Sequence, residues 1–321
     1  MTWIHRFLFF SLFFSAIIGE EKKNKHFLDG VTLGAFKLRS VGPALTSGRV
    51  SDFAVRPGKR HEYYVATASG GVWKTIDGGA TYKPVFDGQG SYSIGCITMD
   101  PNNPYTIWVG TGENNNQRSV GYGDGIYRSK DGGKTWEHKG LKDSQHIAKI
   151  IVDPRNSDIV FVAAIGPLWN EGGDRGLYKT KDGGKTWESK IEVDEHTGVT
   201  DLIMDPHDPD VLYAATYQRR RHVFTWMSGG PGSGLYKSTD GGESWNQLKT
   251  GLPSSIIGRI GLAISPANSD VVYAITEAMD DQQGLYRSSN RGASWTKMSK
   301  YVTSGNYYQE IVAHPTEVNT V

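Results

Sequence analysis

Side chains able to bind a ligand are concentrated in three stretches that interrupt otherwise regular apolar segments. These stretches are GTGENNNQRSVGYGDG (110–125), AIGPLWNEGGDRG (164–176) and TYQRRRHVFTWMSGGPGSG (216–234). Variable loops on a rigid scaffold often carry binding residues, and amides, carboxylates and exposed aromatic rings suit a sugar or a peptide. A solvated loop surface is the alternative for each of them. The candidates are Glu113, Asn114, Asn115, Asn116, Arg118, Trp169, Glu171, Arg175, Arg219, Arg220, Arg221, His222 and Trp226.

The third stretch holds the densest basic run of the chain, Arg219, Arg220, Arg221 and His222. Trp226 and the glycine-rich SGGPGSG follow it, which predicts a mobile loop with an aromatic tip. Such a loop would dock an acidic partner, either an anionic glycan or an acidic peptide segment. The alternative is a solvated charge run without a partner.

An internal repeat must position these loops. Five segments share the template [ST]-x-[DN]-x-G-x-[ST]-[WY], and their third positions are spaced 54, 51, 58 and 50 residues apart. The Asp or Asn side chain can accept nearby backbone N–H groups and so fold a tight turn, which makes these residues structural rather than ligand-binding. The third positions are Asp77, Asp131, Asp182, Asp240 and Asn290.

Each template segment belongs to a unit of four short strands. Strand A precedes a Pro turn, strand B follows it, strand C is a GLYKS-like stretch, and strand D starts at the aromatic residue of the template. Repeated units of this kind predict an all-β fold, a β-propeller. We expect blades at about 43–87, 92–140, 145–192, 197–250 and 255–300, the start of a sixth at 306–321, and a chain that is truncated after Val321.

Alternating strand directions place the A–B turns and the template segments on one face of the propeller. The B–C and D–A loops, which include the three long stretches, lie on the other. Arg49, His146, Arg259 and Glu310 fall near the starts of A strands, beside a central channel. Two arginines there could bind a carboxylate or phosphate in bidentate fashion. A hydrogen-bond network that plugs the channel is the alternative.

The repeated segments resemble the Asp-box, or BNR, repeat. SVGPALTSGRVSDFAV (41–56) and YYVATASGGVWKTIDGG (64–79) are similar to the opening blade of the sortilin-type N-terminal domain of secreted BNR-repeat glycosyl-hydrolase-like proteins. This resemblance implies an exported binding or interaction module whose ligand face is formed by the B–C loops. Sialidases, xyloglucanases and photosystem assembly propellers share the repeat, and the fold does not choose among them.

Part of a secreted glycoside hydrolase is the alternative function. Xyloglucanases carry a catalytic Asp just before a Gly-Gly in the first blade, and the matching TASGGVW places Ala68 there. SVGPALTSGR stands where sialidases have an Arg-Ile-Pro segment. Glu113, Asp124, Glu171 and Glu277 remain as acids, but hydrolysis needs two carboxyl groups that flank the bond. We expect further blades to supply the missing carboxylate if the chain is catalytic.

Composition excludes several other classes of protein. Lys and Arg number 35 against 34 Asp and Glu, a net charge of +1, so no basic field favours nucleic acid. The single Cys96 lies in an apolar strand and supports neither a disulfide nor a multi-cysteine zinc site. The histidines show no ligand-type spacing, and no nucleotide-binding motif occurs. We therefore expect no metal site and no cofactor.

The N-terminal residues 1–19 fit a signal peptide. His5 and Arg6 precede an apolar run from Phe7 to Ile18, which is shorter than the roughly 20 residues of a membrane span. An uncleaved signal anchor is the alternative. We expect an exported protein whose mature part, residues 20–321, is the propeller and has no membrane span.

Overall fold

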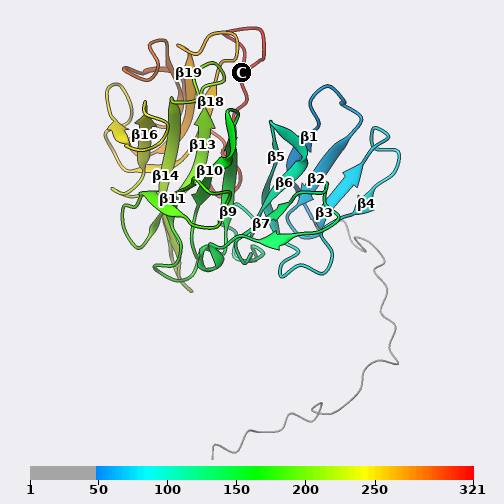
Figure 1. Cartoon of the computed structure of the whole chain (residues 1–321). Coiled ribbons are helices and arrows are strands. Elements are labelled where there is room, and N and C mark those ends of the chain that lie inside the picture. The colour runs from blue at the N-terminus through cyan, green and yellow to red at the C-terminus, as the bar shows by residue number, and fades with distance from the viewer. Residues whose placement is uncertain (1–47) are drawn as a thin grey trace, which may run out of the picture. The chain divides into compact units, whose positions relative to one another are not determined.

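A computed structural model describes residues 48–321, which form five antiparallel sheets, each with a main path of four strands, in chain order (Figure 1). Residues 1–47, with the predicted signal peptide, lie outside the described part. Within residues 48–321 no helix is long and apolar enough to cross a membrane. This all-β architecture confirms the predicted propeller-type blades.

The strands follow the predicted A–B–C–D order in every blade. Blade one is β1 (Val50–Val55), β2 (Tyr63–Thr67), β3 (Gly71–Thr75) and β4 (Lys83–Pro84); blade two is β5 (Ile94–Asp100), β6 (Asn103–Thr111), β7 (Ile126–Ser129) and β8 (Glu137–His138). Blade three is β9 (Ile147–Asp153), β10 (Asn156–Ala164), β11 (Gly176–Thr180) and β12 (Glu188–Ile191). Blade four is β13 (Thr197–Met204), β14 (Leu212–Arg221), β16 (Gly234–Ser238) and β17 (Asn246–Leu248), with β15 (Trp226–Ser228) paired to β14. Blade five is β18 (Ile257–Ile264), β19 (Val272–Ala278), β20 (Gly284–Ser288) and β21 (Thr296–Ser299).

The apolar core lies between consecutive blades. Four clusters each draw side chains from two consecutive blades; Ala66 of blade one, for example, packs with Ile97 and Val109 of blade two. The outward side of blade one keeps Phe53 and Val55 exposed. Residues 306–321 carry no strand, but Ile311 and Val318 pack against blade five. Burial at these seams is what holds the blades together, because each blade alone would expose an apolar face.

The template segments fold as tight side-chain-capped turns. In blade two, Asp131 Oδ1 accepts the Ser129 hydroxyl at 2.8 Å and the backbone N–H groups of Lys134 and Thr135, each at 2.9 Å. Its Oδ2 accepts the Thr135 hydroxyl at 2.6 Å. Asn290 keeps the same turn in blade five, because its Oδ1 accepts the Ser294 N–H and its Nδ2 donates to the Ser294 hydroxyl. The carboxylates are therefore committed to their own turns.

We predict that the Asp turns weaken in acid. Hydrogen bonds from Thr81 and Thr75 lower the pKa of Asp77 to about 2, and equivalent bonds lower the pKa of Asp131, Asp182 and Asp240. Because the pKa of an unfolded Asp is near 3.9, the stabilisation is complete above that pH and is lost as the pH falls toward 2. Urea denaturation between pH 5 and pH 2 measures this. Replacing Asp182 by Asn should flatten the pH dependence, with blade five as the natural precedent.

The tryptophan of the template is less buried than expected. Burial of Trp136, Trp187, Trp245 and Trp295 at equivalent positions is expected from the repeat, but only Trp295 is buried, and the other three are half-buried. The indole N–H groups of Trp136 and Trp187 donate at 2.6 Å to carbonyls of the preceding blade, those of Val85 and Lys139. These rings lie at the edge of a seam, where one side stays open to solvent.

A cation–π pair recurs in each of the five blades. The residue before the last of strand C places its charge over an aromatic ring of strand B at 5.0 to 6.0 Å from the ring centroid. In blades one, three and four the Lys Nζ also donates to a carbonyl in the turn of the next blade. The pairs are Lys74–Tyr64, Arg128–Trp108, Lys179–Phe161, Lys237–Tyr213 and Arg287–Tyr273.

Candidate ligand-binding site

Hydrogen bonds fix which loops share a face. In every blade a backbone N–H of the Asp-type turn donates to a carbonyl in the A–B turn or at the start of strand B, as Gly78 does to His61 at 2.9 Å and Gly183 to Asp158 at 3.0 Å. The B–C and D–A loops therefore lie at the opposite ends of the strands. We call that end the loop face.

The loop Glu113–Asn116 plugs the centre of the loop face. Glu113 is 1% exposed. Its Oε1 accepts Arg49 Nε of blade one at 2.8 Å, the Tyr308 hydroxyl at 3.1 Å and the Asn115 amide at 2.5 Å. The Arg49–Glu113 pair is thus a buried carboxylate held by a cation that is itself half-exposed.

The three asparagines of the plug bind the other blades. Arg259 Nη2 of blade five donates to Asn114 Oδ1 at 2.6 Å, and Arg219 Nη1 of blade four donates to Asn116 Oδ1 at 2.6 Å. The ring Nδ1 of His146, from the start of blade three, lies 2.9 Å from the Glu113 carbonyl. The predicted residues Arg49, Glu113, Asn114, Asn115, His146, Arg219 and Arg259 therefore meet in one network, which matches the alternative of a plugged channel.

Burial sets the charge states of this network. Desolvation lowers the pKa of His146 well below its usual range, and the positive charge of Arg219 lowers it further. The imidazole ring is therefore neutral. Burial also lowers the pKa of Arg219 and Arg259, whose Nη atoms donate to carbonyl and amide oxygens instead of a carboxylate. The plug therefore behaves as a fixed polar core.

The prediction of a mobile, exposed basic loop is wrong. β14 continues to Arg221 and returns as β15, so the run forms a hairpin. Arg219 is 1% exposed, and Arg221 is 8% exposed with its guanidinium 4.5 Å from the centre of the Trp226 ring. Arg220 Nη1 donates to Glu171 at 2.7 Å. Arg219 and Arg221 are internal cross-links, because they donate to oxygens of the plug and, for Arg219, to the Gly166 carbonyl, whereas Arg220 stays at the surface.

The remaining candidates line or brace the loops. Arg118 is exposed and its Nη1 lies 3.4 Å from the Val223 carbonyl at the hairpin tip, and Trp169 is half-buried. Arg175 is buried and donates to the carbonyls of Gly172, Ile165, Pro167 and Asn170, so it holds the 164–176 loop in shape.

Of the carboxylates considered for hydrolysis, Asp124 accepts the Tyr127 hydroxyl at 2.6 Å. Burial raises the pKa of Glu277.

Two exposed tyrosines, which residue types alone did not distinguish, form a rim beside the plug. Tyr92 is 69% exposed and Tyr122 is 51% exposed, and we call them the tyrosine rim. The Ser91 hydroxyl donates to the Tyr122 carbonyl at 2.8 Å, which ties the two loops together. The Tyr122 ring lies 5.7 Å from that of His146. Ala68 is fully buried nearby and its N–H donates to the Arg49 carbonyl.

A second group of charged residues lines a cavity of about 100 Å³ that also contacts Asn114 and Arg259. Although burial opposes it, the carboxylates of Asp201 and Asp52 raise the pKa of Lys149. This group's charged members Lys149, Asp201 and the predicted channel residue Glu310 share a position in the sequence, because each stands five residues before the Pro that follows it. Asp52, Cys96 and Gly261 hold the same position in blades one, two and five.

Comparison with known proteins relates this fold to two groups. The family model Sortilin-Vps10 (Sortilin, neurotensin receptor 3) matches residues 124–232. A xyloglucanase of Paenibacillus sp is 28% identical over 209 residues, which cover 58% of this chain and 19% of that protein. A probable oligoxyloglucan-reducing end-specific xyloglucanase of Neosartorya fischeri is 24% identical over 294 residues, covering 78% of this chain and 34% of that protein. The chain thus spans about a third or less of these relatives.

Solved structures agree on the fold. The GH74 enzyme of Niastella koreensis superposes with a TM-score of 0.57 at 18% identity, covering 77% of this chain and 38% of that one. YCF48 bound to D1 peptide gives a TM-score of 0.53 at 19% identity, covering 84% of this chain and 74% of that one. The protein is a BNR-type β-propeller that resembles glycosyl-hydrolase-like proteins, as expected.

Proposed function

We propose that this chain is a binding propeller for a neutral glycan of the xyloglucan type, which lies across the tyrosine rim on the loop face. The observation that carries the proposal is the pair of exposed rings, Tyr92 and Tyr122, on two loops that are hydrogen-bonded to each other beside the polar plug. Flat aromatic surface with a few fixed polar groups suits a sugar chain. The relatives named xyloglucanases support this class of ligand.

The carboxylates support binding without hydrolysis. Glu113 is held by Arg49, Asp124 by Tyr127, and Glu171 by Arg220. Hydrolysis needs two carboxyl groups that flank the scissile bond. By the resemblance of TASGGVW, Ala68 stands where xyloglucanases carry a catalytic Asp. The second candidate function is that the chain forms part of a glycoside hydrolase. The raised pKa of Glu277 favours it, because a general acid has a raised pKa. An assay for new reducing ends in xyloglucan distinguishes the two functions, because hydrolysis releases them and binding alone does not.

We infer that the protein acts outside the cytoplasm. The apolar run from Phe7 to Ile18, after His5 and Arg6, supports export by a signal peptide. Protease accessibility of the protein on intact cells, or its recovery from the medium, tests this inference.

Replacing Tyr92 and Tyr122 together by Ala should weaken binding of soluble xyloglucan by about 10- to 100-fold, since each stacked ring contributes about 1 kcal/mol. Affinity electrophoresis of the full chain measures the change. Tyr105→Ala is the matched control, because Tyr105 is 53% exposed and its carbonyl accepts the Gly132 N–H on the opposite face. Unchanged binding in the double variant, or an equal loss in the control, contradicts the proposal.

A further inference from the structure

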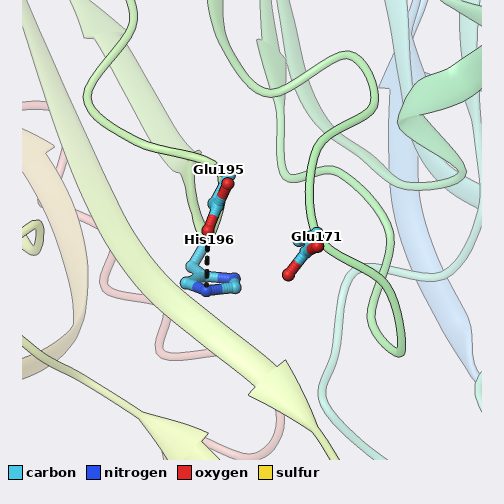
Figure 2. Close-up of side chains that lie close together, drawn as sticks. All are labelled: Glu171, Glu195 and His196. Carbon is cyan, nitrogen blue, oxygen red and sulfur yellow. Dashed lines mark ion pairs between the residues drawn. The ribbon is translucent and has the colours of Figure 1, made fainter.

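Three side chains with metal-ligating atoms meet on the loop face (Figure 2). Glu171 lies in the loop between β10 and β11, and Glu195 and His196 lie in the connection between β12 and β13. One ligand atom from each lies within 4.8 Å of the other two. We propose that this triad binds a divalent transition-metal ion, with Zn²⁺ as its best-suited occupant.

The donor set favours zinc over the hard cations. Imidazole nitrogen and carboxylate oxygen bind Zn²⁺ at about 2.0–2.2 Å, which puts tetrahedral ligand atoms about 3.4 Å apart. His196 Nε2 and Glu195 Oε1 are already 3.6 Å apart. Magnesium and calcium prefer oxygen ligands alone, so the imidazole discriminates against them. Three protein ligands leave a fourth position for water or a ligand oxygen.

The histidine presents one nitrogen to the ion. His196 Nδ1 is buried and has no hydrogen-bond partner among the described residues, whereas Nε2 faces Glu195. The two carboxylates are more than half exposed. Their exposure lets both carboxylates rotate toward an ion, with Glu171 keeping its bond to Arg220 through Oε2.

The backbone that carries the ligands is fixed in advance. The Gly172 N–H donates to the Glu195 carbonyl at 2.8 Å, which clips the two loops directly. The guanidinium of Arg175 braces them by donating to the Gly172 carbonyl at 2.8 Å and to the His196 carbonyl at 3.5 Å. Binding therefore need not order a loop, which is the main cost of a surface metal site.

Charge also favours a cation. With a neutral imidazole, Glu171 and Glu195 contribute two negative charges, and Arg220 offsets one of them. Arg220 Nη1 binds Glu171 Oε2 at 2.7 Å, which leaves Oε1 for the ion and orients the carboxylate. The site is thus coupled to the hairpin of β14 and β15.

Calorimetric titration of the metal-free full chain with ZnCl₂ tests the proposal. We expect one ion per chain, and at least a tenfold weaker affinity in His196→Ala and in the double variant Glu171→Gln, Glu195→Gln. A rise in melting temperature with Zn²⁺ but not with Mg²⁺ is the second readout. His222→Ala is the matched control, because His222 is exposed on the neighbouring hairpin. Equal affinities in wild type and His196→Ala, or an equal loss in the control, overturn the proposal.

Discussion

Replacing Arg219 by Ala should lower the free energy of unfolding by about 3–5 kcal/mol, whereas replacing Arg220 by Ala should change it by less than about 1 kcal/mol. Arg219 is 1% exposed and donates to the Asn115 carbonyl, the Asn116 side chain and the Gly166 carbonyl at 2.6–3.0 Å. Its removal leaves buried acceptors without donors in a cavity that apolar atoms cannot fill. Arg220 makes one exposed ion pair, with Glu171.

Urea denaturation followed by circular dichroism measures both variants. Because the two arginines are adjacent in sequence and identical in charge, net charge cancels in the comparison. A small effect of Arg219→Ala would show that the plug contributes little to stability. An effect of Arg220→Ala as large as that of Arg219→Ala would show that the hairpin depends on its surface charge.

Trp295→Ala should cost about 3–5 kcal/mol, the usual range for a large core ring that leaves a cavity. Trp295 is 4% exposed and packs in the core between blades four and five, with Tyr213 and Ile260. The equivalent Trp245 is half-buried, so Trp245→Ala should cost roughly half as much, because less apolar surface returns to water.

The denaturation midpoints of the two tryptophan variants decide this prediction. They share one repeat position in neighbouring blades, although the turn before Trp245 is built on Asp240 and the turn before Trp295 on Asn290. Equal losses would mean that the ring contributes through its turn and not through its burial. A loss below about 1 kcal/mol for Trp295→Ala would remove it from the core.

Local chemistry explains why so much of the fold could be predicted from the sequence. The Asp-type turn needs only a carboxylate or amide, a hydroxyl and a glycine at fixed offsets, and Asp131, Ser129 and Thr135 meet as that pattern predicts. Strand order and the grouping of turns on one face follow from antiparallel connections. Every blade obeys both rules.

The sites were harder to predict because their residues are distant in sequence. A mobile loop is expected for residues 219–221, because the sequence around them shows no acceptor for their charge. The acceptors of Arg219, which are Asn115, Asn116 and Gly166, lie in other blades. The proposed zinc triad departs from the expectation of no metal site for the same reason. That expectation rested on the single cysteine and on the spacing of ligand residues along the sequence, whereas Glu171 and His196 are brought together by folding.

The plug also has a consequence for the order of folding. Propeller blades interact with their neighbours, so structure can spread from blade to blade through contacts of short sequence separation. The bonds of Asn114 to Arg259 and of Glu113 to Tyr308 join residues 145 and 195 positions apart. Contacts of such separation form late and slowly, because a long chain must close first. Closure of the plug is therefore expected as the final step, which converts a series of loosely coupled blades into one cooperative unit.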